Sequence, residues 1–130
     1  IAMRPRCLVL DEPTAMLDPQ GRRDVMKTVK SLNKNMGMAV VFITHFMDEA
    51  VKADRIIVID EGKKAAEGTP ADIFARKSLL KKCGLDIPES AELAEKLAEN
   101  GIKLDTQPLT PEDFTSAFLR YTDSIKITGA

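Results

Sequence analysis

The sequence has no apolar run that is long enough to cross a membrane. Its longest such run, residues 38–43, falls far short of the roughly 20 residues that a transmembrane helix needs. The first residues do not show the charged, apolar and small-residue segments of a secretory signal peptide. We therefore expect a globular chain whose contact with a membrane is at most indirect. Its length allows either one compact core or a small core plus an appended helical piece.

Cysteine is scarce, and the net charge is small. Cys7 lies in an apolar segment and Cys83 near a predicted helix end, which favours a reducing compartment, the cytosol, over a disulfide framework. The chain has 19 basic and 20 acidic residues, so it has no broad positive field to hold a nucleic acid backbone. DNA and RNA are not expected partners.

A phosphate-binding loop of the form GxxxxGK[ST] is also missing. Gly62 and Gly68 come nearest to that pattern, but they are one residue too far apart. Thr69 follows them where the pattern requires lysine. The backbone amides and the lysine that hold phosphates in such a loop are therefore not supplied by this sequence.

The first part of the chain has the pattern of a β-α-β unit. Residues 7–11 predict a buried strand, and Asp18 followed by Pro19 predicts the start of a helix that Gly37 ends. Residues 38–44 form a continuous apolar segment, typical of a strand that is covered on both faces in a parallel sheet. Residues 1–6 look like the end of a helix whose beginning is absent, so we expect the chain to start within a domain.

The rest of the chain is predicted to form a hairpin and then helices. The expected elements are a short helix at 47–53, strands at 55–60 and 63–67 around a Glu61-Gly62 turn, and helices at 69–84, at 88–100 and from 110 onward. Residues 101–109 are the expected linker. The change of pattern predicts two parts, residues 1–68 and residues 69–130.

Polar residues follow both apolar strands of the predicted β-α-β unit. Asp11 and Glu12 end the first strand, and His45 follows the second. Parallel strands collect ligands beyond their carboxyl ends, and neighbouring strands lie about 5 Å apart, so these groups would flank one reacting group. One carboxylate could contact the water shell of Mg²⁺ while the other orients a nucleophilic water.

Each of these groups also has a plain structural interpretation. The acidic pair alone fits an acidic turn before Pro13. A single histidine after an apolar strand is more often a hydrogen-bonded polar residue than a catalytic one. Asp18 before Pro19 is an ordinary N-cap. Arg22 and Arg23 fit a solvated helix face better than a phosphate site.

Longer strings of residues decide between these interpretations. Residues 7–18, CLVLDEPTAMLD, resemble the Walker B motif and D-loop of ATP-binding cassette (ABC) ATPases, and residues 42–45, FITH, resemble the segment that carries the family's switch histidine. Residues 44–62 are similar to the switch region of the transporter ATPases. The resemblance implies an α/β fold: a partial P-loop NTPase core with parallel strands and a hairpin, followed by a C-terminal α-helical extension.

The resemblance also implies a role for each matching residue. Asp11 would assist Mg²⁺, Glu12 would be the catalytic base, and His45 would contact the γ-phosphate of ATP as sensor and positioner. The D-loop, which reaches toward a partner subunit, would comprise Ala15, Met16, Leu17 and Asp18. The family more often has serine at position 15, so Ala15 removes a hydroxyl from that loop.

Residues 67–74 and 83–89 resemble, more loosely, the ATPase subunits of energy-coupling factor transporters, including the cobalt-import type. This resemblance implies uptake of metal ions or vitamins with ATP and Mg²⁺ as cofactors. The implied partners are a second ATPase subunit, a transmembrane coupling subunit and a substrate-binding membrane subunit. The implied place is the cytoplasmic face of the cell membrane, and the solute would be selected by the separate membrane subunit.

Such ATPases carry an adenine-stacking aromatic loop, a P-loop, a Q-loop and an LSGGQ signature before the Walker B motif, and residues 1–130 contain none of them. We therefore expect the chain alone to hold ATP very weakly and not to hydrolyse it. In the family's sheet the P-loop strand lies between the strand before His45 and the strand after Arg55, so a gap is expected there.

Two alternatives remain open. The chain could be a stand-alone dimerisation or docking module that uses residues 69–130. A self-sufficient metal hydrolase built on Asp11, Glu12 and His45 ranks last because it would have few ligands.

Overall fold

The computed structural model describes residues 5–128. The expected helix end at residues 1–6 therefore lies largely outside the described residues, and Pro5 and Arg6 have no regular secondary structure. By its internal packing the chain divides into two compact units, residues 1–49 and residues 50–130. The boundary at residue 69 that the sequence pattern suggests stays a prediction.

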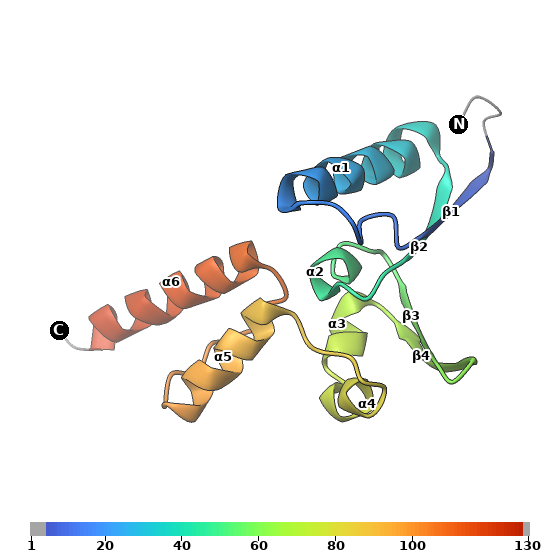
Figure 1. Cartoon of the computed structure of the whole chain (residues 1–130). Helices are drawn as coiled ribbons and strands as arrows, with labels where there is room; N and C mark the ends of the chain where they lie inside the picture. Colours follow the sequence, from blue (N-terminus) through green and yellow to red (C-terminus); the bar gives the residue numbers. More distant parts are fainter. Residues whose placement is uncertain (1–4, 129–130) are drawn as a thin grey trace. The chain divides into compact units, whose positions relative to one another are not determined.

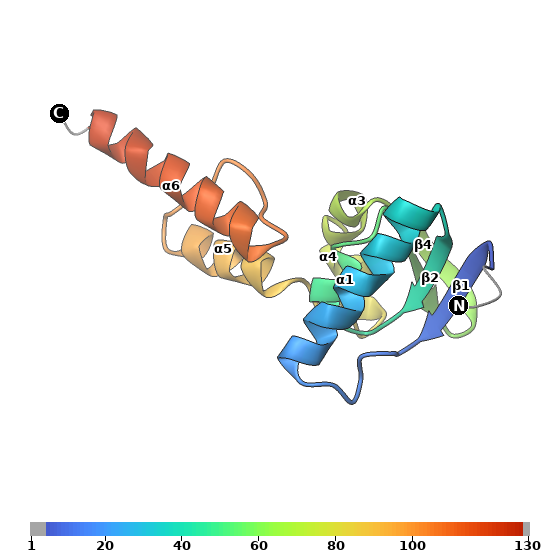
Figure 2. The same ribbon diagram turned by 90° about the horizontal axis from the view of Figure 1, so that it is seen from above.

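The first unit is a β-α-β unit, as the sequence predicts. Strand β1 (Cys7–Asp11), helix α1 (Pro19–Met36) and strand β2 (Ala39–Ile43) follow one another along the chain. The two strands pair in parallel, with Cys7 opposite Ala39 and Asp11 opposite Ile43. Helix α1 lies along one side of this strand pair (Figures 1 and 2).

Both ends of α1 are set by the residues that the sequence singles out. The Asp18 carboxylate accepts a hydrogen bond from the backbone N–H of Gly21 at 2.9 Å, and Pro19 occupies the first turn. At the other end Gly37 adopts a left-handed conformation with φ of 62°, and the N–H of Met38 donates to the Leu32 carbonyl at 3.3 Å. Helix α1 therefore ends at Met36, and β2 begins three residues later at Ala39.

The prediction that these strands are buried on both faces is wrong. Exposure alternates along β1 and β2: Leu8 and Leu10 are partly covered, whereas Val9 and Val41 are 62% and 49% exposed. Cys7 is exposed as well. The reason is that α1 covers one face of the strand pair, so the side chains on the other face stay open among the described residues.

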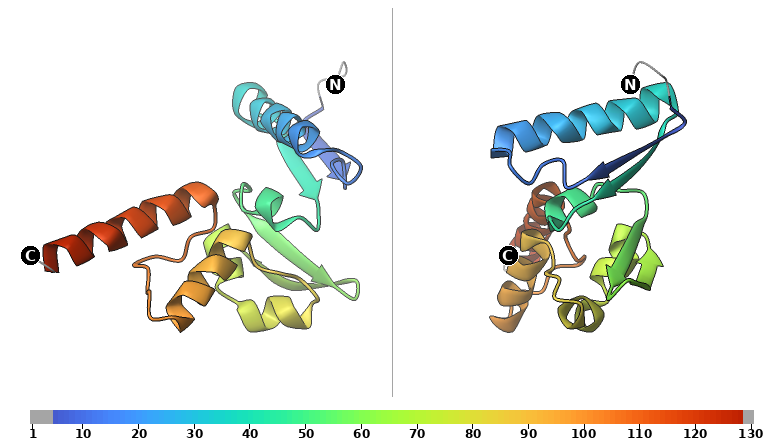
Figure 3. Two further views of the ribbon diagram at one scale, coloured as in Figure 1. Left: turned by 60° about the vertical axis from the view of Figure 1, so that its left-hand side comes forward. Right: turned by 45° about the vertical axis from the view of Figure 1, so that its right-hand side comes forward.

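The second unit begins at the last residue of helix α2 (Met47–Ala50), a helix that is shorter than predicted. Strands β3 (Ile56–Asp60) and β4 (Lys63–Gly68) form an antiparallel hairpin whose turn residues, Glu61 and Gly62, have φ of 46° and 73°. Figure 3 shows this hairpin in two further views. The remaining elements are α3 (Pro70–Phe74), α4 (Lys77–Lys82), α5 (Glu89–Glu99) and α6 (Pro111–Thr128).

The single helix predicted over residues 69–84 is in fact two helices. Arg76 leaves the helical region, with φ of −90° and ψ of 56°, and separates α3 from α4. The break allows both short helices to contribute to one core, because Ile73 and Phe74 of α3 and Leu80 of α4 are each 1% exposed. Burial of these three side chains outweighs the continuous helix that local propensity favours.

The start of α3 is held by a capping box. The Thr69 hydroxyl accepts from the Asp72 N–H, and the Thr69 N–H and hydroxyl donate to the Asp72 carboxylate. These hydrogen bonds from Thr69 lower the pKa of the Asp72 carboxyl below its ordinary value. None of the helices within residues 5–128 combines the length and the apolar character of a membrane span.

We predict that Gly37→Ala destabilises the chain by about 1 kcal/mol, because a Cβ is disfavoured at a left-handed φ. An added Cβ would meet nothing within 4 Å, so the cost is confined to the backbone. Urea unfolding followed by circular dichroism measures it. Gly37→Asn should cost less, since asparagine adopts this conformation more easily. Equal stability of the alanine variant and the parent chain would contradict the prediction.

Candidate functional site

The site lies where the two parallel strands end. Asp11 pairs with Ile43 in the last position of the register, and the N–H of Glu12 extends the pairing by donating to the Ile43 carbonyl at 2.9 Å. Glu12 and His45 therefore leave the same edge of the sheet. The Nδ1 atom of His45 lies 2.9 Å from Oε1 of Glu12, within hydrogen-bonding distance.

The carboxylate and the imidazole remain open to solvent. The side chains of Glu12 and His45 are 50% and 57% exposed. When the imidazole is neutral, Nδ1–H donates to the carboxylate and Nε2 is left as an acceptor; when it is protonated, both nitrogens donate. A bound molecule could therefore meet a carboxylate and a fixed imidazole at one place.

The backbone at Glu12 is strained. Its φ of 43° lies in the left-handed region, which costs a residue with a Cβ roughly 1–2 kcal/mol. Directly afterwards the N–H of Ala15 donates to the Glu12 carbonyl at 3.2 Å, and the N–H of Leu17 donates to the Thr14 carbonyl at 3.1 Å. The chain thus leaves β1 through a left-handed residue and two tight turns.

Asp11 is adjacent to this pair in sequence but does not join it. Its side chain is exposed at the end of β1, and no hydrogen bond among the described residues connects it to Glu12 or His45. An open carboxylate of this kind fits Mg²⁺, which keeps several water ligands and needs few from the protein. Within residues 5–128 no three histidine, cysteine, aspartate or glutamate side chains are grouped so as to enclose a metal ion.

The loop from Ala15 to Asp18 is exposed. Met16 is 97% exposed and Leu17 is 41% exposed, whereas the neighbouring Thr14 is buried. Asp18 caps α1, which agrees with its plain structural interpretation. The loop thus presents apolar side chains to solvent between two anchored ends.

Sequence reasoning missed a group of residues behind His45. Arg22 was expected on a solvated face, and this is wrong: its side chain is 23% exposed, and its Nε donates at 3.0 Å to Glu49, whose side chain is 3% exposed. The partners are 27 residues apart, so no helical period could reveal the pair. Arg23 does lie on the solvated face, where it donates to Gln20.

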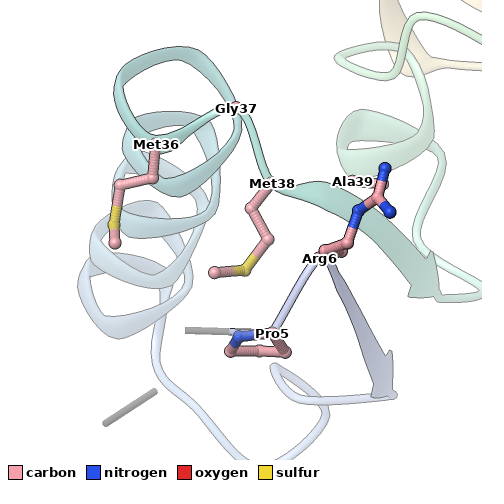
Figure 4. Close-up of a pocket in the computed structure, with 6 residues that line it drawn as sticks. All are labelled: Pro5, Arg6, Met36, Gly37, Met38 and Ala39. Atoms are coloured by element: carbon pink, nitrogen blue, oxygen red, sulfur yellow. The ribbon is translucent and has the colours of Figure 1, made fainter. Parts of the chain in front are cut away.

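A pocket lies at the opposite end of the strands (Figure 4). It has a volume of about 550 Å³ and is lined by Pro5, Arg6, Met36, Gly37, Met38 and Ala39. These residues surround the amino ends of β1 and β2, whereas Glu12 and His45 follow the carboxyl ends. The pocket contains none of the predicted site residues.

The fold is that of the ABC ATPases. A bacterial Atm1-family ABC exporter with ATP bound superposes with a TM-score of 0.55 and 25% identity, over 62% of this chain and 14% of the exporter chain. The structure of cbiO1 from Clostridium perfringens is described as part of the ABC transporter complex cbiONQ. It superposes with a TM-score of 0.54 and 36% sequence identity, over 72% of this chain and 38% of the cbiO1 chain.

Within that class, the chain is similar to part of the energy-coupling factor type ATP-binding proteins. The relative named energy-coupling factor transporter ATP-binding protein EcfA1 of Clostridium perfringens is 51% identical over 90% of this chain. The protein of the same name in Caldanaerobacter subterraneus is 52% identical over 92% of the chain. The chain spans 42% and 43% of the lengths of these two relatives. No protein-family model matches the chain.

The strain at Glu12 is testable by substitution. We predict that Glu12→Gly is more stable than Glu12→Ala by about 1 kcal/mol, because glycine removes the Cβ that a positive φ disfavours. Both variants lose the hydrogen bond to His45, so their difference isolates the backbone contribution. Urea unfolding of the two variants measures it. An alanine variant as stable as the glycine variant would show that Glu12 is not strained.

Proposed function

We propose that this chain is the C-terminal part of the ATP-hydrolysing subunit of an energy-coupling factor importer for a metal ion or a vitamin. In it, residues 1–68 supply the magnesium, catalytic and switch half of the ATP site, and residues 69–130 form the helical extension. The observation that carries the proposal is the 2.9 Å contact between Glu12 and His45 beyond the paired ends of β1 and β2. The names of the most similar relatives support the transporter assignment.

Glu12 is the general base of the proposed reaction. Its carboxylate is half exposed, so it can accept a hydrogen bond from an attacking water. When the His45 imidazole is protonated, Nδ1–H donates to that carboxylate and Nε2–H can donate to the γ-phosphate of ATP. The two side chains thus orient the water and the phosphate relative to each other.

Asp11 would hold Mg²⁺ through the ion's water ligands. The exposed carboxylate at the end of β1 fits this role, because its oxygens are not engaged by other described residues. An ion held there would supply positive charge that offsets the phosphate charge in phosphoryl transfer. The phosphates themselves would be held by a P-loop outside these 130 residues.

The proposed partners follow from the exposed loop and from the relatives. Residues 15–18, with the fully exposed Met16, would contact a second ATPase subunit. A transmembrane coupling subunit and a substrate-binding membrane subunit would complete the importer, and the chain would then lie at the cytoplasmic face of the membrane. The solute would be selected by the membrane subunit.

A docking module is the second candidate, and one observation favours it. Helix α6 exposes Leu119, Ile125 and Ile127 by 57%, 52% and 80%. Apolar side chains at this density are typical of a surface that contacts another protein. Dimers of the 130-residue chain in sedimentation experiments, together with an unaffected ATPase in the Glu12 variant described next, would favour this candidate.

We predict that Glu12→Gln in the complete subunit lowers the rate of ATP hydrolysis by about 10²- to 10⁴-fold and leaves ATP binding intact, because the amide cannot accept the proton of the attacking water. Steady-state hydrolysis and nucleotide binding measure the two effects. Glu99→Gln, at an exposed position near the end of α5, is the matched control and should keep full activity. Full activity in both variants would refute the proposed role of Glu12.

We also predict that the 130-residue chain alone neither hydrolyses ATP nor binds Mg·ATP with a Kd below about 1 mM, because its sequence has no GxxxxGK[ST] loop, whose backbone amides and lysine hold phosphates. Isothermal titration calorimetry and phosphate release measure this. Tight binding by the isolated chain would show that another part of it holds the nucleotide, and would contradict the proposed division of the ATP site.

A further inference from the structure

Behind His45, Arg22 of α1 contacts two groups at once. Its Nε donates at 3.0 Å to Oε1 of Glu49, and the centre of its guanidinium group lies 3.7 Å from the centroid of the Phe46 ring. A guanidinium group is suited to this double contact because it is planar and permanently charged, so it can stack on a ring and pair with a carboxylate. Arg22 thereby connects α1 to the segment that carries His45.

Glu49, the partner of Arg22, also binds the segment on either side of His45. Its second oxygen, Oε2, accepts from the Thr44 hydroxyl at 2.7 Å, and the same hydroxyl accepts from the N–H of Phe46 at 3.0 Å. The Glu49 carboxylate therefore holds Thr44 directly and Phe46 through the Thr44 hydroxyl. Since Glu49 is 3% exposed, its charge is little screened by water and depends on Arg22 for compensation.

Phe46 completes the chain of contacts to the imidazole. The Phe46 and His45 rings lie 4.3 Å apart between centroids, at an interplanar angle of 34°. One face of the phenylalanine contacts the guanidinium group, so the ring cannot shift without disturbing Arg22. His45 is thus supported by Phe46 on one side and bonded to Glu12 on another.

We propose that Arg22 is a positioning residue for His45, acting through Glu49 and Phe46 to hold the imidazole against Glu12. The proposal rests on the function proposed above for Glu12 and His45. Arg22 itself does not touch the reacting groups. Its backbone N–H donates to the Asp18 carbonyl at 3.0 Å, so the same residue connects the exposed loop at 15–18 to the histidine.

The other charged groups near Arg22 do not replace Glu49. Asp48 lies 3.8 Å from the guanidinium group, but its side chain is 73% exposed, so solvent screens that contact. Arg23, one residue further along α1, contacts the exposed Gln20. Substitution of Arg23 therefore changes the charge of the same helix turn and leaves the support of His45 in place.

The test uses the fact that His45 is the only histidine in the sequence, so its ring nitrogens are directly identifiable by NMR. In the 130-residue chain, at an alkaline pH where an ordinary imidazole is neutral, long-range proton–nitrogen correlations report which nitrogen carries the proton. The parent chain should carry it mainly on Nδ1, because Nδ1 faces the Glu12 carboxylate. Glu12→Ala provides the spectrum of the unsupported ring, with the proton mainly on Nε2.

We expect Arg22→Gln to move the ring from mainly Nδ1–H to mainly Nε2–H, toward the Glu12→Ala spectrum, while Arg23→Gln keeps the parent spectrum. If Arg22→Gln does not fold because Glu49 is left unpaired, the pair Arg22→Gln with Glu49→Gln removes both charges and gives the same readout. Arg22→Lys keeps the charge but loses the planar stacking, so its share of Nδ1–H should lie between that of the parent chain and that of Arg22→Gln. An unchanged tautomer in the folded Arg22 variants, or a parent ring already mainly Nε2–H, would overturn the proposal.

A second measurement separates this proposal from the proposed function. In the complete subunit, Arg22→Gln should lower kcat for ATP hydrolysis by about 10- to 100-fold with little change in KM, as expected when a catalytic group is displaced and binding is not. If Glu12→Gln leaves hydrolysis unchanged, the proposed function fails, whereas the NMR result still decides whether Arg22 positions His45. If Glu12→Gln abolishes hydrolysis and Arg22→Gln does not alter kcat, the positioning role fails alone.

Discussion

Parallel pairing of β1 with β2 is the constraint on which the site depends. The register places Asp11 opposite Ile43, and the next hydrogen bond, from Glu12 to Ile43, carries the pairing to the edge of the sheet. Two residues that are 33 positions apart in sequence, Glu12 and His45, thereby leave the sheet together. A slip of the register by one residue would turn every side chain of the shifted strand to the other face and separate the pair.

The geometry at this edge is held in place by more than the sheet. Glu12 keeps a left-handed backbone, which is costly unless its surroundings demand it. Behind His45, the buried Glu49 joins Arg22 to Thr44 and so holds the loop from α1. Groups held in a defined position would suit the phosphoryl transfer proposed for this site, because positioning accounts for much of the rate of such reactions.

Local sequence signals predicted most of the elements. Asp18, Pro19 and Gly37 bound α1, and the Glu61-Gly62 turn forms the hairpin, because caps and tight turns depend on a few neighbouring residues. The burial of β1 and β2 and the single helix over 69–84 were predicted wrongly. Both depend on what packs against the segment, which a local pattern does not contain.

For the site, the sequence by itself determined which chemical groups are present and at which strand ends they lie, through the strings around Asp11, Glu12 and His45. Only the tertiary structure decided that Glu12 bonds to His45 while Asp11 stays apart, and that Arg22 is engaged behind the histidine and Arg23 is not. The physical reason is that motifs record residues close in sequence, whereas hydrogen bonds, stacking and desolvation act between atoms brought together across the fold.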